Sequence, residues 1–229
     1  MLRRIQKLYS ANAYNKRRAI FMNILKPTSQ DKIMDLGGGN GSLITNIIQG
    51  SQSYNITSAD ILQENLDHIK LAYKYSTVLI PESDRLPFKD GEYDIVFCNS
   101  VIEHVTVPKE FIWNMKSGKE FKEQSLKRQK EFADEIRRVG KGYFVQTPNK
   151  YFLIESHSWL PGIVAILPRP ILIRVLRFFN LFWPKKARPD WNLLSYRQMQ
   201  NLFPDAIIYR EKSLGFTKSL IAIKKGSLS

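Results

Sequence analysis

The sequence predicts an α/β fold built on a doubly wound, mainly parallel seven-stranded sheet. Strand-like apolar runs alternate with amphipathic helix-like runs along most of the 229 residues, and this alternation is typical of parallel sheets covered by helices on both faces. The last two strand-like runs, 206–211 and 219–224, are separated by too few residues for a helix, so an antiparallel last strand is expected. Apolar residues make up 43% and charged residues 24%, as in ordinary globular proteins.

The individual elements follow from apolar spacing and from the residues that end each run. Helical spacing over 4–25 stops at Pro27, because proline cannot continue a helix. The run 93–99 is apolar on both faces, as expected at the centre of a parallel sheet. Further strands are predicted at 32–36, 55–60, 77–80 and 142–147, and further helices at 42–49, 63–72, 119–139 and 195–202, the last capped by Ser195.

We expect one domain over residues 1–229, because neither repeats nor a clear linker divide the chain. Within it, residues 1–30 form an N-terminal helical segment and residues 108–130 a charged insertion. Residues 149–194 form an apolar and basic insert after the fifth strand. The run 159–183 is very apolar but contains three arginines, and an arginine near the centre of a spanning helix costs roughly 3 kcal/mol. No transmembrane helix is therefore predicted.

Charge and cysteine content limit the partners of the protein. The formal net charge of +14 attracts nucleic acid, anionic lipid or acidic substrates, or it serves solubility alone. Nucleic acid is not the expected partner, because the chain lacks an RNA-binding motif. The single cysteine, Cys98, excludes a disulfide framework and a cysteine metal site, and no metal is expected. The N-terminus lacks a signal peptide, so we expect a cytoplasmic protein, with membrane association left open.

The strongest local signal is a glycine loop that directly follows one predicted strand and directly precedes a helix. It reads Asp35-Leu-Gly37-Gly38-Gly39-Asn40-Gly41. Glycines let the backbone turn tightly and approach a ligand, as in dinucleotide sites. However, Asp35 would repel a pyrophosphate and would suit a cation, such as the ammonium of an amino-acid cofactor. Asp60 ends the second strand, where an acid can accept both hydroxyls of a ribose or cap the next helix.

The chain resembles the class I S-adenosylmethionine methyltransferases, in particular the methyltransferase type 11 group, whose fold is Rossmann-like. The pieces that carry the resemblance are KIMDLGGGNGSL, ITSAD and ESDRLPFKDGEYDIVFCNSVIEHV, in the order of the family. The resemblance implies S-adenosylmethionine as the cofactor. It also implies a set of cofactor-binding residues: Asp35, Gly37, Gly38, Gly39 and Gly41 for the methionine part, Asp60 for the ribose, Ile61, Glu82 and Ser83 for the adenine, and Asn99 and Ser100 for the pocket wall.

Two histidines are candidates for a direct chemical role. His104 belongs to the VIEHV motif, which lies near the cofactor edge in the family, and a purely structural role is the alternative. His157 follows the fifth strand, and the carboxyl ends of such strands face the site. A general base helps when the acceptor is a hydroxyl. His68 lies in a helical pattern and is expected on the surface.

The insert leaves three roles open. Residues 151–188 predict an amphipathic pair of short helices flanked by basic residues. This pair fits a lid over the acceptor pocket, an interfacial membrane patch or a homodimer interface. The first two roles favour a large or partly apolar acceptor.

The expected function is methyl transfer to an oxygen or nitrogen of a small-molecule, lipid-like or saccharide acceptor. Transfer is in line, so positioning matters most. Two alternatives are a nicotinamide-dependent oxidoreductase and a non-catalytic subunit with a methyltransferase-like fold that binds a membrane or a partner.

Overall fold

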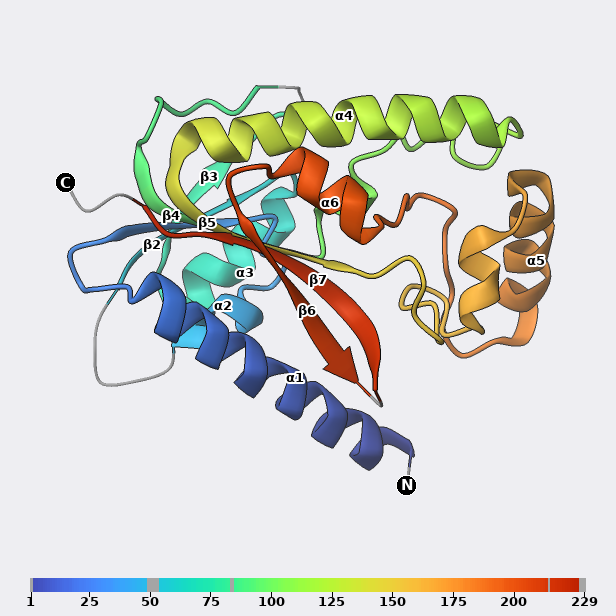
Figure 1. Cartoon of the computed structure of the whole chain (residues 1–229), viewed down its shortest axis with the longest axis horizontal. Helices are drawn as coiled ribbons and strands as arrows, with labels where there is room; N and C mark the ends of the chain where they lie inside the picture. Colours follow the sequence, from blue (N-terminus) through green and yellow to red (C-terminus); the bar gives the residue numbers. More distant parts are fainter. Residues whose placement is uncertain (1, 49–53, 83–84, 214, 227–229) are drawn as a thin grey trace. The chain divides into compact units, whose positions relative to one another are not determined.

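The computed structural model of the chain describes residues 2–48, 54–82, 85–213 and 215–226. Its strands form one seven-stranded sheet in the order β3-β2-β1-β4-β5-β7-β6 (Figure 1). The pairs β1·β2, β1·β4 and β2·β3 are parallel and the pair β6·β7 is antiparallel, which confirms the predicted fold class. The strands are β1 (Lys32–Leu36), β2 (Asn55–Asp60), β3 (Ser76–Leu79), β4 (Tyr93–Asn99), β5 (Gly140–Pro148), β6 (Ile207–Ser213) and β7 (Phe216–Lys224).

The helices lie where the apolar spacing predicts them. Pro27 lies two positions after the last residue of the first helix. Ser195 caps the last helix in a reciprocal capping box with Gln198. The helices are α1 (Leu2–Leu25), α2 (Ser42–Ile48), α3 (Gln63–Tyr73), α4 (Gly118–Val139), α5 (Arg169–Phe182) and α6 (Tyr196–Leu202), with short 3-10 helices η1 (Ile102–His104) and η2 (Gly162–Ile166). Among the described residues, none of these helices is long and apolar enough to cross a membrane.

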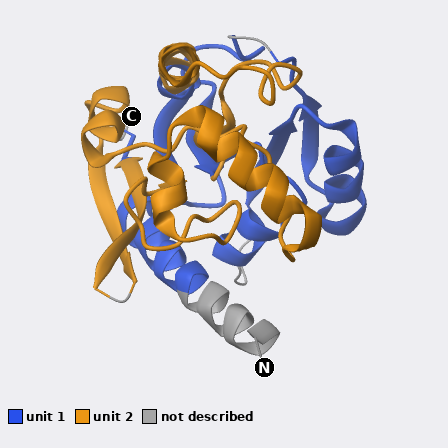
Figure 2. Cartoon of the chain, turned by 90° about the vertical axis from the view of Figure 1, so that its right-hand side faces the viewer, with its two compact units in different colours: residues 1–99, 136–144, 224–229 blue, residues 100–135, 145–223 orange. Residues whose placement is uncertain are grey.

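The chain forms two compact units, which Figure 2 draws in different colours. Unit 1 comprises residues 1–99, 136–144 and 224–229, and unit 2 comprises residues 100–135 and 145–223. The single domain expected from the sequence stays a prediction.

Unit 1 contains the first four strands and the helices α1 to α3. Phe21 of α1 packs edge-on against Phe97 and Phe144, and all three rings are buried. The parallel register of β1 and β2 places Asp35 opposite Ser58. Since both strands end within two residues of this pair, the glycine loop and Asp60 emerge at the same edge of the sheet.

Unit 2 contains most of α4, the insert and the β6·β7 pair. The charged stretch predicted at 108–130 is in large part regular helix, because α4 begins at Gly118. Lys127 and Lys130 make i,i+4 ion pairs on the exposed side of α4, while Gln129 is fully buried. The insert has its own core around Leu172, Leu176 and Trp191. The first predicted helix of the insert is the 3-10 turn η2, and the second is the amphipathic helix α5.

Candidate functional site

The glycine loop between β1 and α2 turns on three left-handed glycines. Gly37, Gly39 and Gly41 have φ values of 69°, 56° and 71°, a region that side chains other than glycine rarely adopt. The Gly37 N–H donates to the Ala59 carbonyl of β2 over 2.7 Å, which ties the loop to the next strand. A methyl group built on Gly39 would meet no atom within 4 Å. The loop therefore leaves open space at Gly39, as a cradle for a ligand requires.

Asp35 lies beneath this loop and has a buried, unsatisfied carboxylate. The residue is 2% exposed, and its Oδ2 has no hydrogen-bond partner among the described residues. Burial, followed by the charge of Asp60, raises the pKa of Asp35 from 3.8 to about 7. A methyl group on Gly38 would lie 1.9 Å from Oδ2, so only glycine lets the loop approach the carboxylate this closely. Such an anion favours a cationic ligand.

Asp60 connects the end of β2 with the glycine loop and with α3. Its Oδ2 accepts hydrogen bonds from the Gly39 N–H and from the Asn65 side chain, both over 3.2 Å. Its Oδ1 accepts the Leu62 N–H over 2.9 Å at the start of α3. Asp60 therefore lies at the loop, and it accepts the N–H of the N-cap residue Leu62 without capping the first turn of α3. Its role in ribose binding stays a prediction. Ile61, next in the chain, is 37% exposed.

A buried arginine that the sequence did not single out lies at the end of β4. Arg17 of α1 is 7% exposed and donates from Nη1 to Oδ1 of Asn99 over 3.0 Å. Sequence reasoning missed Arg17 because its partner is 82 residues away and its local pattern is simply helical. A guanidinium at this position provides a donor for a carboxylate.

The structure says less about the other predicted cofactor residues. Glu82 is exposed, and Ser83 lies outside the described residues. Ser100 belongs to unit 2, where its N–H and hydroxyl donate to the main-chain and side-chain oxygens of Gln146. Its φ of 56° is in the left-handed region.

The described residues of unit 1 fit the cofactor that the resemblance implies. S-adenosylmethionine has an ammonium, a carboxylate and a ribose. Asp35 would supply the anion for the ammonium, Arg17 a cation for the carboxylate, and Asp60 oxygens for the ribose hydroxyls. A dinucleotide fits less well, because the buried Asp35 carboxylate would face its phosphates.

Unit 2 holds a separate cluster around His157, which is 15% exposed. Its Nδ1 lies 2.6 Å from Oε1 of Glu155, and its Nε2 lies 3.8 Å from Oε1 of Glu103. Trp191 stacks on the imidazole at a centroid distance of 5.5 Å. Burial lowers the pKa of His157, but the two carboxylates outweigh burial and raise it to about 9. A pKa of about 9 favours the imidazolium at neutral pH, a form that donates hydrogen bonds and does not remove a proton from an acceptor.

His104 lies beside this cluster. Its ring meets that of His157 edge-on at 4.7 Å, and its Nδ1 lies 3.5 Å from Asp190. Burial raises the pKa of Asp190, but hydrogen bonding to His104 and the charges of both histidines bring it below its usual value. The two histidines that the sequence singled out are thus neighbours, although 53 positions separate them.

Glu103 completes the cluster. It is fully buried, and its Oε2 accepts a hydrogen bond from Thr147 over 3.0 Å. Its Oε1 has no hydrogen-bond partner among the described residues. Glu103, His104 and His157 each offer one ligand atom within 4.8 Å of the others, a donor set that could hold a divalent metal. The sequence-based expectation of no metal stays a prediction.

The chain matches known proteins over its first half. Residues 34–117 match the family model "Methyltransferase domain". A ubiquinone biosynthesis O-methyltransferase of Rickettsia bellii is 37% identical over 93 residues, which cover 37% of this chain and 35% of the relative. The corresponding enzyme of Rickettsia conorii is 33% identical over 106 residues, covering 42% and 34%. The chain therefore spans about a third of the length of the curated relatives that it matches.

Solved structures extend the likeness to most of the chain, at the level of the fold alone. A protein of Pyrococcus horikoshii aligns with a TM-score of 0.54 and 13% identity, covering 93% of this chain and 91% of that protein. A candidate O-methyltransferase of Nostoc punctiforme aligns with a TM-score of 0.57 and 12% identity, covering 93% and 56%. The structural matches confirm the predicted fold, and the match of residues 34–117 to the methyltransferase model agrees with the predicted resemblance.

Proposed function

Since residues 34–117 carry a methyltransferase domain within a class I fold, we propose that the protein is an S-adenosylmethionine-dependent methyltransferase. The observation that carries this proposal is the Asp35 carboxylate, buried and unsatisfied beneath a four-glycine loop. Burying an anion without a partner is costly, which is why burial raises the pKa of Asp35 to about 7, and a cationic ligand would offset this cost. The ammonium of S-adenosylmethionine is such a cation.

In this proposal, different residues of unit 1 bind different groups of the cofactor. Asp35 holds the ammonium, Arg17 and Asn99 hold the carboxylate, and Asp60 holds the ribose while its bond to Gly39 keeps the loop in place. The bound cofactor supplies a methyl group on a positively charged sulfonium, which needs no further activation. The task left to the chain is to bind and orient the reactants.

We propose an oxygen atom as the first methyl acceptor to test, and nitrogen as the second. The relatives of the first half are named O-methyltransferases of ubiquinone biosynthesis, which supports an oxygen acceptor of lipid-like character. The imidazolium of His157 offers a hydrogen bond that an oxygen atom can accept. Its raised pKa argues against proton removal by His157.

The insert 151–188 supports contact with a membrane. Ile163, Ile166, Phe178, Leu181 and Phe182 are each more than half exposed, which is unusual for side chains of this size. A lid and a homodimer interface are the alternatives for this surface.

The test is calorimetric titration with S-adenosylhomocysteine, using NAD as the control ligand. We expect binding of S-adenosylhomocysteine alone. Asp35→Asn should weaken it about 100-fold or more, because it removes one partner of a buried charge pair. Asp67→Asn is the matched control, since Asp67 is an exposed residue of α3 that bonds only Gln63 among the described residues. Binding of NAD, or equal losses in both variants, would contradict the proposal.

A further inference from the structure

Unit 2 contains a basic cavity outside the sites described above. It has a volume of about 460 Å³ and lies between α5 and the segment 113–116. Three of its lining side chains are cationic: Lys116, Arg174 and Arg177. Acidic residues do not line it within the described part of the chain.

These three cations lack the partners that basic residues elsewhere in unit 2 have. Lys127 and Lys130 pair with acids one turn away, whereas Lys116, Arg174 and Arg177 have no carboxylate partner among the described residues. Like charges three positions apart on a helix repel each other. An external anion bound between Arg174 and Arg177 would offset this repulsion.

The cavity wall is held in place by buried contacts. Arg169, at the start of α5 and 5% exposed, donates to the carbonyls of Ile112 over 2.6 Å and Met115 over 2.7 Å. These bonds fix the two ends of the lining segment to α5. Trp113, between them, presents its indole to Arg177 at 5.6 Å, within the range of a cation–π contact. The cationic groups thus surround a preformed hollow, which lowers the entropic cost of binding a ligand.

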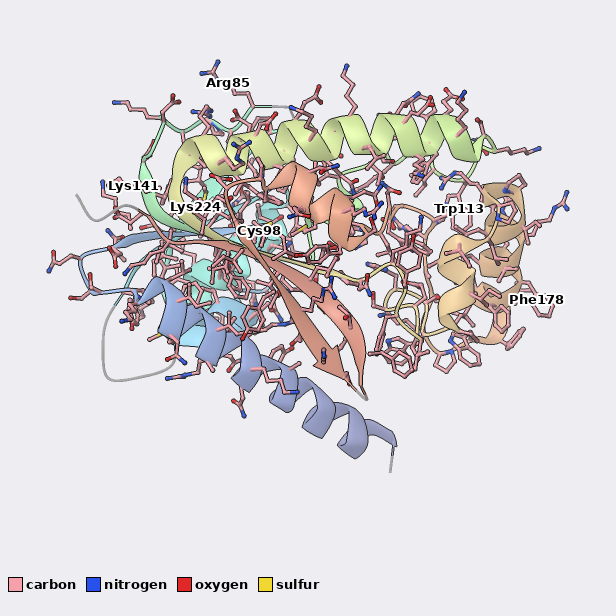
Figure 3. The ribbon with its side chains drawn as sticks, in the orientation of Figure 1. Arg85, Cys98, Trp113, Lys141, Phe178 and Lys224 are labelled. Carbon is pink, nitrogen blue, oxygen red and sulfur yellow. The ribbon has the colours of Figure 1, made fainter. Side chains whose placement is uncertain are left out.

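An apolar stripe of α5, Phe178 and Leu181, follows the two arginines of the cavity along the helix. Phe178 lies one turn after Arg174, and Leu181 one turn after Arg177, so each cation has an apolar neighbour on the helix surface. Phe178 is 58% and Leu181 79% exposed, and Figure 3 shows Phe178 directed outward from α5, on the side away from Trp113. A ligand that satisfies both features carries an anionic head and a hydrocarbon tail.

We propose that this cavity binds the phosphate of an anionic phospholipid in a bilayer, with the apolar stripe of α5 in the acyl region. The proposal deepens the membrane contact suggested for the insert. It does not depend on methyl transfer, because every residue that carries it belongs to unit 2. The three cations and the indole select the phosphate, and the exposed Phe178 and Leu181 distinguish a membrane from a soluble phosphate ester.

The test is flotation of the full chain with two kinds of vesicle, pure phosphatidylcholine and phosphatidylcholine mixed with phosphatidylglycerol. We expect binding to the anionic vesicles only. The double variant R174Q/R177Q should bind them about 30-fold more weakly, at about 1 kcal/mol for each basic residue near the surface. The double variant K127Q/R197Q removes the same charge from exposed positions of α4 and α6 and should keep most of the binding.

Three outcomes would overturn the proposal. Equal losses in the two double variants would mean that net charge alone drives binding. Vesicle binding that is unchanged in F178S/L181S would show that the apolar stripe does not contact the membrane. Binding of inorganic phosphate without vesicle binding, or a stable dimer that covers α5, would give the surface another occupant. Titration of each variant with S-adenosylhomocysteine reports on unit 1, so that a failure of the methyltransferase proposal is seen separately.

Discussion

The glycine loop of unit 1 and the histidine cluster of unit 2 each contain a buried carboxylate, Asp35 and Glu155, and the electrostatic states of these two are opposite. Asp35 has no cation among the described residues, and burial raises its pKa to about 7. Burial also raises the pKa of Glu155, but the hydrogen bond and charge of His157 bring it below the usual value. The first carboxylate is unsatisfied until a ligand arrives, whereas the second is satisfied by its own chain. A buried acid of the first kind indicates a binding site for a cation, and one of the second kind stabilises the fold.

The largest effect should come from a buried charge that the chain satisfies itself. Arg169→Leu removes the donor to the Ile112, Met115 and Pro189 carbonyls, and leaves buried acceptors unpaired. We expect a loss of roughly 3–5 kcal/mol in the free energy of unfolding, measured by chemical denaturation. Arg188→Leu, at an exposed position of unit 2, is the control and should change the stability little. A small effect of Arg169→Leu would show that the insert does not depend on this arginine.

The next effect concerns His157 and its pH dependence. The pKa is raised from 6.5 to about 9 in the folded chain, so the imidazolium stabilises the fold fully below pH 6.5 and this stabilisation is lost as the pH rises through 9. The difference corresponds to about 3 kcal/mol. Denaturation across this window should show the decline in the wild type and a flatter profile in His157→Gln. Parallel profiles would mean that His157 is not protonated in the folded state.

A smaller effect should appear in the pH dependence of cofactor binding to unit 1. With a pKa of about 7 in the free chain, Asp35 must lose a proton before it can pair with the ligand ammonium. The affinity for S-adenosylhomocysteine should fall about tenfold for each pH unit below 7, with proton release on binding. Calorimetry in buffers of different ionisation enthalpy measures both quantities. An equally steep profile in Asp35→Asn would assign the proton to another group.

The smallest effect tests a purely local feature. Ser195→Ala removes the hydroxyl that accepts the Gln198 N–H in the capping box of α6. The expected loss is about 1 kcal/mol in the free energy of unfolding, with S-adenosylhomocysteine binding unchanged. Thermal denaturation measures the loss, and a change in binding would link α6 to unit 1.

The sequence by itself determined the features that depend on neighbouring residues. The bounds of β1, β2 and β4 agree with those predicted, because turn residues bound these runs. The glycine loop and Asp60 could also be predicted from the sequence. Glycine is required where φ is positive, and the two features lie within one β-α-β unit. The buried thiol of Cys98 followed in the same way, from its place in an apolar run.

Only the tertiary structure decided the features that depend on distant partners. Arg17 reaches Asn99 across 82 positions, and Arg169 reaches Ile112 across 57. His157 owes its raised pKa to Glu103, whose carboxylate lies on another segment. A side chain's local pattern indicates whether it is helical or apolar, but protonation and ligand preference depend on the charges that folding brings within a few ångströms.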